Sequence, residues 1–392
     1  MCEHENTKKI ISFVFVQKNQ RIKPKNRKII KPTKRIRIKD IAKKAEVSIG
    51  TVDRVIHNRG EVSPETKEKI LRILEEMDYR PNILASALAS KKVHQFAILI
   101  PEPQSEEAYW NKPMTGVQRA FQNLQEYGIQ ITAYRFSQSE PESFRIKAGE
   151  ILQNQPEGVV LAPFFSRESK AFIEKLTELH IPYIFIDSNL KECKKISYIG
   201  QNSFQSGTLA ARLYDWSLPG KACILVVHFA KEMDNQNHLV QRENGFYDYF
   251  SRAETGPLKT LVTLEIEDPS PQNISKAIEE ELKKQKKIDG IFVTNSQVYR
   301  MAACLNEKGL KGIRLIGHDL IRQNMFWLKE EVVDFLICQR PEEQGYQAVE
   351  TLFRHVILKQ QVLAENYTSI DIITKENLDF YKEFNLINYG TN

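Results

Sequence analysis

Two groups of side chains in this chain have types and spacings that suit chemistry, and the first lies in the segment VSIGTVDRVIHN, residues 47–58. Arg54 falls in a short stretch with helical apolar spacing, and an arginine on such a helix can donate two hydrogen bonds to a guanine in the major groove of DNA. Ser48 and Thr51 lie at the start of that stretch, where hydroxyls and backbone N–H groups bind phosphates. The segment therefore predicts contacts to double-stranded DNA.

Two short helices joined by a tight turn would position these side chains. Residues 38–45 have one apolar face, and a second helix from Ile49 to about Ile56 follows Ser48, which can cap it. Such a pair is a helix-turn-helix, whose second helix lies in the major groove. A third helix is predicted after Ser63, with Pro64 in its first turn. Its apolar stripe would close a small core: Ile70, Leu71, Ile73, Leu74 and Met77.

This region resembles the DNA-binding head and hinge of the lac/gal repressor family of bacterial transcription regulators. The similarity is carried by V-S-x-x-T-V-x-R-V at 47–55, S-P-E-T-x-x-K-I at 63–70, Y-R-P-N at 79–82 and A-x-x-L at 85–88. Glu46 departs from the pattern, because the family usually has glycine in this turn.

The resemblance implies roles for further residues of the second helix. Ile49 and Gly50 occupy the positions with which the family reads bases, although Gly50 offers no side chain. Asp53 either accepts a hydrogen bond from a cytosine amino group or pairs with a nearby basic residue. His57 either contacts a phosphate or faces solvent, and Asn58 completes the candidate DNA-binding set.

Residues 82–92 are predicted to form a conditional helix, because eleven residues are too few for a stable isolated helix in water. In the family, two hinge helices of a dimer form against DNA and a leucine enters the minor groove, a role that falls to Leu88 here. The alternative is that Leu88 packs the head onto the next domain. The implied partner is a near-palindromic operator bound by a homodimer or a dimer of dimers.

The second group of side chains follows a series of apolar runs. These runs are residues 96–100, 158–162, 183–187, 222–227, 290–294, 313–317 and 334–338. Amphipathic helical segments separate them, for example 114–127, 167–179, 203–216, 239–253 and 297–308. The alternation predicts parallel sheets covered by helices on both faces. Ligands of such sheets bind beyond the carboxyl ends of the strands, where Asp187, Asn295 and Asp319 are found.

Residues 95–385 resemble the ribose/galactose-type periplasmic binding proteins, whose fold the lac/gal family uses as its sensor. Matching pieces include IPYIFIDSN (181–189), QRENGF (241–246) and IRLIGHD (313–319). The resemblance implies two α/β lobes joined by crossovers near residues 200, 320 and 340, which close on a sugar or sugar-like effector by a hinge motion.

Each candidate ligand residue has an alternative role. Trp110 either covers the apolar face of a sugar ring or is a surface or packing tryptophan. Phe164 follows another apolar run and is also a candidate ligand residue. Arg242 either donates to ring, hydroxyl or carboxylate oxygens or forms a salt bridge with Glu243 or another acid. Asp187 is either a ligand contact or a hinge or helix-capping residue.

Asn295 and Asp319 can both bond vicinal hydroxyls of a sugar. Ser296 stands where the family usually has aspartate, so one acidic hydroxyl acceptor is missing. This departure argues against an ordinary neutral hexose as the effector.

Composition and charge support the same division of the chain. Residues 1–40 contain 13 Lys/Arg and 3 Asp/Glu, a net charge of +10 against +6 for the whole chain, as a DNA-binding end requires. We expect a basic arm at 1–35, an all-α helix-turn-helix head at 36–81, a hinge helix at 82–94 and a two-lobed α/β effector-binding and dimerisation domain at 95–392. The arm is interpreted as disordered, with a targeting segment as the alternative.

Other classes of protein are disfavoured. The five cysteines are widely spaced and form no C-x-x-C pair, which is typical of reduced thiols in a cytoplasmic protein. The sequence contains no G-x-G-x-x-G, P-loop, H-E-x-x-H or G-x-S-x-G motif and no apolar stretch long enough to span a membrane. We therefore expect no catalytic residue, cofactor or metal. The remaining alternative is a solute-binding protein for transport or chemotaxis without a DNA function.

Overall fold

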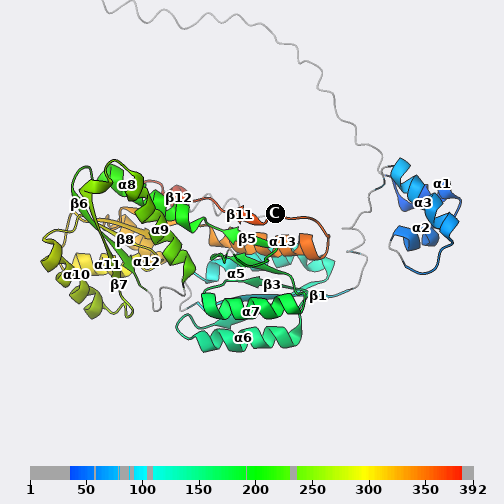
Figure 1. Cartoon of the computed structure of the whole chain (residues 1–392), viewed down its shortest axis with the longest axis horizontal. Helices are drawn as coiled ribbons and strands as arrows, with labels where there is room; N and C mark the ends of the chain where they lie inside the picture. The colour runs from blue at the N-terminus through cyan, green and yellow to red at the C-terminus, as the bar shows by residue number, and fades with distance from the viewer. Residues whose placement is uncertain are drawn as a thin grey trace, which may run out of the picture. The chain divides into compact units, whose positions relative to one another are not determined.

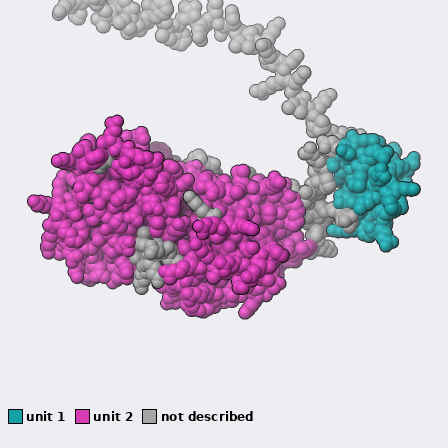
Figure 2. Space-filling view, in the orientation of Figure 1, with its two compact units in different colours: residues 1–82 teal, residues 83–392 magenta. Residues whose placement is uncertain are grey.

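The computed structural model describes residues 36–56, 59–77, 79, 88, 92–103, 109–190, 192–229 and 236–381. The chain forms two compact units, residues 1–82 and 83–392 (Figures 1 and 2). The predicted basic arm at 1–35 lies outside the described residues.

The described part of the smaller unit contains three helices, α1 (Ile38–Ala45), α2 (Ile49–Ile56) and α3 (Pro64–Glu76), as the sequence predicted. Two caps are confirmed: Ser48 Oγ accepts from Thr51 N at 3.1 Å, and Ser63 Oγ accepts from Thr66 N at 3.4 Å. Glu46 takes a left-handed conformation with φ of +60° at the end of α1, which explains why glycine suits this turn.

Seven buried side chains from the three helices form the core of this unit: Ile41, Ala42, Ala45, Val52, Val55, Ile70 and Ile73. Leu74 and Met77 pack against it. The prediction for Leu71 was wrong, since this side chain is 49% exposed. It follows Ile70 by one residue, about 100° around the helix, and therefore faces away from the core.

The described residues of the larger unit form two sheets of six strands each. The first has the order β11-β5-β4-β3-β1-β2 and the second the order β12-β10-β9-β8-β6-β7. Every described pair is parallel except β10 with β12. The strands of the first sheet are β1 (His94–Pro101), β2 (Ile129–Phe136), β3 (Gly158–Leu161), β4 (Tyr183–Ile186), β5 (Ser197–Gly200) and β11 (Glu365–Tyr367). Those of the second are β6 (Ala222–His228), β7 (Lys259–Glu265), β8 (Gly290–Val293), β9 (Arg314–His318), β10 (Phe335–Cys338) and β12 (Asp371–Ile373).

Helices cover both faces of each sheet, and each sheet with its helices is called a lobe (Figure 1). In the first lobe, α5 (Asn111–Leu124) and α13 (Pro341–Val356) cover one face, and α6 (Pro141–Asn154) and α7 (Ser166–Glu178) cover the other. In the second lobe, α8 (Ser203–Ser217) and α9 (Asn237–Arg252) lie on one face. The opposite face carries α10 (Pro271–Gln285), α11 (Val298–Glu307) and α12 (Arg322–Lys329). Short 3-10 turns occur at Gln125–Tyr127 and Gly256–Leu258. Among the described helices, none is long and apolar enough to cross a bilayer.

The chain passes between the lobes three times: from β5 to α8, from β10 to α13 and from β11 to β12. The predicted crossovers near residues 200 and 340 are confirmed. The one near 320 was wrong, because β9 and β10 on either side of it belong to the same sheet. The segment nevertheless reaches the other lobe, since Lys112 Nζ donates to Leu320 O at 2.7 Å. The third crossover lies at residues 368–370 instead.

Candidate functional site

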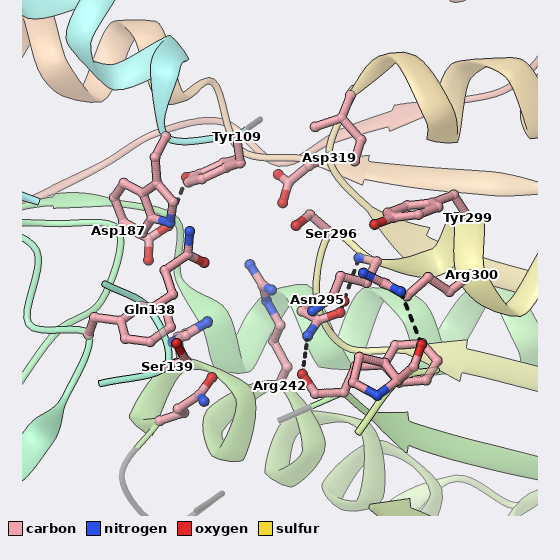
Figure 3. A pocket seen from close by; sticks show the side chains of 18 of the residues that line it. Tyr109, Gln138, Ser139, Asp187, Arg242, Asn295, Ser296, Tyr299, Arg300 and Asp319 are labelled. Atoms are coloured by element: carbon pink, nitrogen blue, oxygen red, sulfur yellow. Dashed lines mark hydrogen bonds between the residues drawn. The ribbon is translucent and has the colours of Figure 1, made fainter. Parts of the chain in front are cut away.

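A cavity of about 510 Å³ lies between the two lobes, at the carboxyl ends of strands from both sheets. Side chains from both lobes point into it (Figure 3). The cavity lining contains all six side chains that the sequence singled out for a ligand site: Trp110, Phe164, Asp187, Arg242, Asn295 and Asp319. They come together because the carboxyl ends of parallel strands meet at one edge of each sheet.

Aromatic side chains form much of the wall that the first lobe contributes. The Trp110 ring meets Tyr109 edge-on with centroids 5.1 Å apart and meets Phe164 at 6.4 Å. Trp110 is 5% exposed and also belongs to the core cluster between β1 and α5. The two roles considered for this residue are thus combined in one ring, because it packs in the core and lines the cavity.

Asp187 follows β4 in a left-handed conformation, with φ of +65°. Its Oδ1 accepts from the Tyr109 hydroxyl at 2.7 Å, and its backbone N–H donates to Gln344 Oε1 at 3.0 Å. Burial and the negative charge of Asp187 raise the pKa of Tyr109 well above its usual value. Tyr109 therefore stays protonated and holds the carboxylate at the cavity wall.

Asp319 occupies the matching place after β9, with φ of +70°. The Gln339 amide donates to its two carboxylate oxygens at 3.1 and 3.4 Å. Burial raises the pKa of Asp319 to about 6, although Arg242 and the Gln339 hydrogen bond oppose the shift. The second lobe thus contributes an acid that gains or loses its proton in the mildly acidic range.

Arg242 extends from α9 into the cavity and is only 2% exposed (Figure 3). Its Nη1 donates to the carbonyl of Thr294 at 2.6 Å, and its Nε has no hydrogen-bond partner in the described part of the chain. The salt bridge considered with Glu243 is not formed. Glu243 instead lies 3.4 Å from His228 Nε2 and accepts from the Thr263 hydroxyl.

Asn295 lines the cavity, but both ends of its amide bond the backbone. Its Nδ2 donates to Phe229 O at 2.9 Å, and its Oδ1 accepts from Gln297 N at 3.1 Å. A neighbouring buried amide, Asn324, donates to the carbonyls of Ser296, His318 and Asp319 at 2.8 to 3.0 Å. Asn295 and Asn324 therefore shape the loops that carry the other cavity residues.

The sequence analysis missed several residues of the site. Gln339 lines the cavity directly after β10, so the rule that located Asp187 and Asp319 could also have found it. Gln344 is fully buried and links Asp187 N to Gln339 O, to which its Nε2 donates at 2.8 Å. His238 lines the cavity one helical turn before Arg242. No pattern in the sequence distinguishes Gln344 from an ordinary helix residue.

In the smaller unit, the candidate DNA-contacting residues lie on the outer side of α2. Ser48, Gly50 and Arg54 are exposed and Ile49 is 56% exposed, whereas Val52 and Val55 of the same helix are buried. Thr51 and Asp53 are partly exposed. The Arg54 side chain folds back on its helix, where its Nε donates to Gly50 O at 3.3 Å.

Three further DNA-binding candidates fall on or beside residues that the structure does not describe. His57 and Asn58 fall outside the described residues. Within the predicted hinge helix at 82–94, Leu88 is described as helical and 55% exposed, whereas Lys92 and Val93 are described as non-helical and His94 already belongs to β1.

Comparisons with known proteins agree with both units. The chain matches the model of the lacI family of bacterial regulatory proteins over residues 37–82 and that of a periplasmic binding protein domain over residues 96–360. It is 26% identical to catabolite control protein A of Staphylococcus epidermidis, over 53% of this chain and 67% of that protein. It is 24% identical to the ribose operon repressor of Halalkalibacterium halodurans, over 72% and 80% of the two chains. With several other curated relatives, the match spans about half of the relative's length.

Solved structures give the same result. A protein from Bacteroides fragilis assigned as a LacI transcriptional regulator is 31% identical, with a TM-score of 0.69 over 74% of this chain and all of that chain. The glucose-galactose binding protein of Geobacillus stearothermophilus shares the fold at 19% identity and a TM-score of 0.65, over 73% and 99% of the two chains. The chain therefore belongs to the lacI family of bacterial regulatory proteins, with a helix-turn-helix head followed by a periplasmic-binding-protein domain.

Proposed function

We propose that this protein regulates transcription by binding a near-palindromic operator as a dimer and by releasing or holding it when a small sugar-like effector enters the cavity. The observation that carries the proposal is that one chain combines two features. The outer side of α2 is exposed, and a cavity between two lobes is lined by aromatic, polar and charged side chains. The relatives named above are regulators rather than enzymes, which supports a binding function.

The head would read DNA through α2. The Ser48 cap fixes the start of this helix, and its hydroxyl also bonds the Thr51 hydroxyl at 2.9 Å, so both side chains lie where phosphates can be bound. Ile49 and Gly50 would meet base edges, and Arg54 would exchange its bond to Gly50 O for two bonds to a guanine. His57 and Asn58 would extend this DNA-binding surface. Asp53 would accept a hydrogen bond from a cytosine amino group or pair with a nearby basic residue.

The effector would couple to DNA through the hinge. A ligand that bonds Asp187 on the first lobe and Asp319 and Arg242 on the second favours one angle between the lobes. If that angle changes how two hinge segments of a dimer meet, the insertion of Leu88 into the minor groove becomes easier or harder. Coupling of this kind amounts to a few kcal/mol of differential affinity.

The DNA proposal is tested by selecting binding sites for the full chain from random-sequence DNA and footprinting the selected site. We expect two-fold symmetric protection and an affinity that falls steeply with salt. Arg54→Ala should cost roughly 1–3 kcal/mol on the selected site and much less on random DNA. The matched control is Arg72→Ala, an exposed arginine of α3 paired with Glu68, which should change neither affinity.

The alternative function is solute binding for transport or chemotaxis, which the shared fold with the glucose-galactose binding protein would permit. Retention of the protein on DNA distinguishes the regulatory function from the solute-binding function. Failure of the full chain to select any sequence, with binding that does not respond to salt, would favour the solute-binding alternative.

A further inference from the structure

The cavity contains a buried positive charge that forms no ion pair with any described residue. Arg242 is 2% exposed, yet it forms no ion pair with any acid in the described part of the chain, and Nη1 makes its one hydrogen bond, to a backbone carbonyl. Taking a guanidinium out of water without an anionic partner is unfavourable. Because the group points into the cavity, a bound molecule is the natural source of the missing negative charge (Figure 3).

A second donor lies beside it. His238 precedes Arg242 by four residues on α9, and both side chains line the cavity. Its Nδ1 is buried and has no hydrogen-bond partner among the residues that the structure describes. Burial lowers the pKa of His238 to about 4, so the ring is neutral and can donate from one nitrogen at physiological pH. The α9 N-terminus also borders the cavity through Gln236, and a helix N-terminus favours a negative group.

The other charged side chains around the cavity limit how much negative charge the bound molecule can carry. Among the described residues that line it, four are acidic, Asp187, Glu267, Asp268 and Asp319, and two are arginines, Arg242 and Arg300. A phosphate carries about 1.5 to 2 negative charges and would be repelled by this surplus of acids. A carboxylate carries one charge and matches the planar donor fork of an arginine.

The acids in turn suit hydroxyl groups. Asp187 and Asp319 lie on opposite lobes, and each retains acceptor capacity beyond the bonds from Tyr109 and Gln339. A molecule with hydroxyls next to these acids and a carboxylate next to Arg242 would satisfy both kinds of group. The apolar C–H face of such a molecule could lie against Trp110.

We propose that the effector is a hydroxylated monocarboxylic acid, a sugar acid, whose carboxylate binds Arg242 and His238 while its hydroxyls bind Asp187 and Asp319. This inference rests on the proposed ligand-sensing function and names the chemical class of the ligand.

The test compares sugar acids with neutral molecules of the same shape. Thermal unfolding of the full chain is measured in the presence of three sugar acids, each compared with neutral counterparts. D-glucuronate is compared with D-glucuronamide and D-glucose, D-galacturonate with D-galactose, and D-gluconate with D-glucitol. At least one acid should raise the Tm by about 5 °C or more at 100 times its Kd, whereas its neutral counterpart should not. Neutral members that stabilise the protein as strongly as their acids would overturn the assignment but leave the sugar-sensing function standing. If no compound of either kind stabilises the protein, both proposals fail.

Two variants locate the carboxylate. Arg242→Gln should abolish the shift produced by the acid, because it removes the positive charge and the donor fork. His238→Gln should weaken the binding of the acid about tenfold or more, because the amide cannot place a donor where the imidazole ring holds its N–H. The control is Arg252→Gln, which removes an exposed arginine of the same helix that pairs with Asp248 and should leave binding unchanged. If His238→Gln and Arg242→Gln fold but bind the acid like the parent protein, the carboxylate site is overturned. Should Arg242→Gln fail to fold, the His238→Gln result decides alone.

Discussion

The two lobes place an aspartate at the same point of the same topology, yet they line the cavity with different chemistry. Asp187 follows the fourth strand of the row β2-β1-β3-β4, and Asp319 follows the fourth strand of β7-β6-β8-β9. Both residues have a left-handed backbone, with φ of +65° and +70°. The repeated fold therefore fixes where an acid is presented and leaves the surrounding wall free to differ.

The surrounding walls do differ. The first lobe adds four aromatic rings, Tyr109, Trp110, Phe164 and Phe165, whereas the second adds two rings, Phe229 and Tyr299, together with the charged groups of Arg242 and Arg300. A ligand between them must present an apolar face to one lobe and polar atoms to the other. This division suggests that the second lobe contributes most of the polar binding energy.

The largest expected effect tests that division directly. Arg242→Ala removes the buried donor fork and should weaken effector binding by about a hundredfold or more, because bonds to charged groups contribute roughly 1.5–3 kcal/mol each. Isothermal titration calorimetry with the effector measures the loss. The comparison variant is Arg300→Ala in the same lobe. Arg300 already bonds Pro269 O at 3.0 Å, so its removal should have a smaller effect. Equal losses in the two variants would mean that the second lobe acts through overall charge.

A second prediction concerns Asp319 of the second lobe and the way the free energy of unfolding depends on pH. The pKa of Asp319 is raised to about 6 from 3.8, so the folded state holds this proton more tightly than the unfolded chain does. The contribution of Asp319 to the free energy of unfolding should therefore fall as pH rises from about 4 to above 6, by at most about 3 kcal/mol.

Asp319→Asn removes the charge and suits a positive φ. At pH 8 it should raise the free energy of unfolding by about 2 kcal/mol and flatten its dependence on pH between 4 and 6, while weakening effector binding. Urea unfolding at several pH values measures this. A variant that is less stable at pH 8 would show that the Asp319 carboxylate is stabilised by its neighbours rather than strained by burial.

The smallest effect is expected in the first lobe. Tyr109→Phe keeps the ring that meets Trp110 but removes the hydroxyl that donates to Asp187 at 2.7 Å. We expect a loss of about 0.5–1.5 kcal/mol in the free energy of unfolding and a severalfold weaker affinity for the effector, because Asp187 loses the donor that orients it. Tyr127→Phe is the matched control, since Tyr127 packs against Phe353 in the same lobe and does not line the cavity. A change of similar size in both variants would assign the effect to general packing.

Much of this arrangement is predictable from local signals. The central strands are continuous apolar runs buried on both faces, which is why β1, β3, β4, β6, β8, β9 and β10 follow from the sequence. The edge strands β2 and β7 were not predicted, because they mix buried and exposed positions and contain polar residues. The short strands β5, β11 and β12 were not predicted either.

The remaining features depend on partners that are distant in the sequence. Gln344 is buried because α13 returns to the first lobe and brings it against Asp187, 157 residues away. The misplaced crossover near residue 320 has the same origin, since only the pairing of β9 with β10 reveals that the chain stays in the second lobe. Single-residue patterns cannot encode such contacts.

The three passages between the lobes have a consequence for how the protein is made. The first lobe begins at β1 but receives α13 and β11 only after the whole second lobe up to β10 has been synthesised. Until residues 341–367 leave the ribosome, one face of the first sheet lacks the α13 residues Ala348, Val349 and Leu352 that complete its core. Neither lobe can then finish folding before the other, so the larger unit should fold late and as a whole. Truncations near its C-terminus should therefore destabilise the first lobe as much as the second.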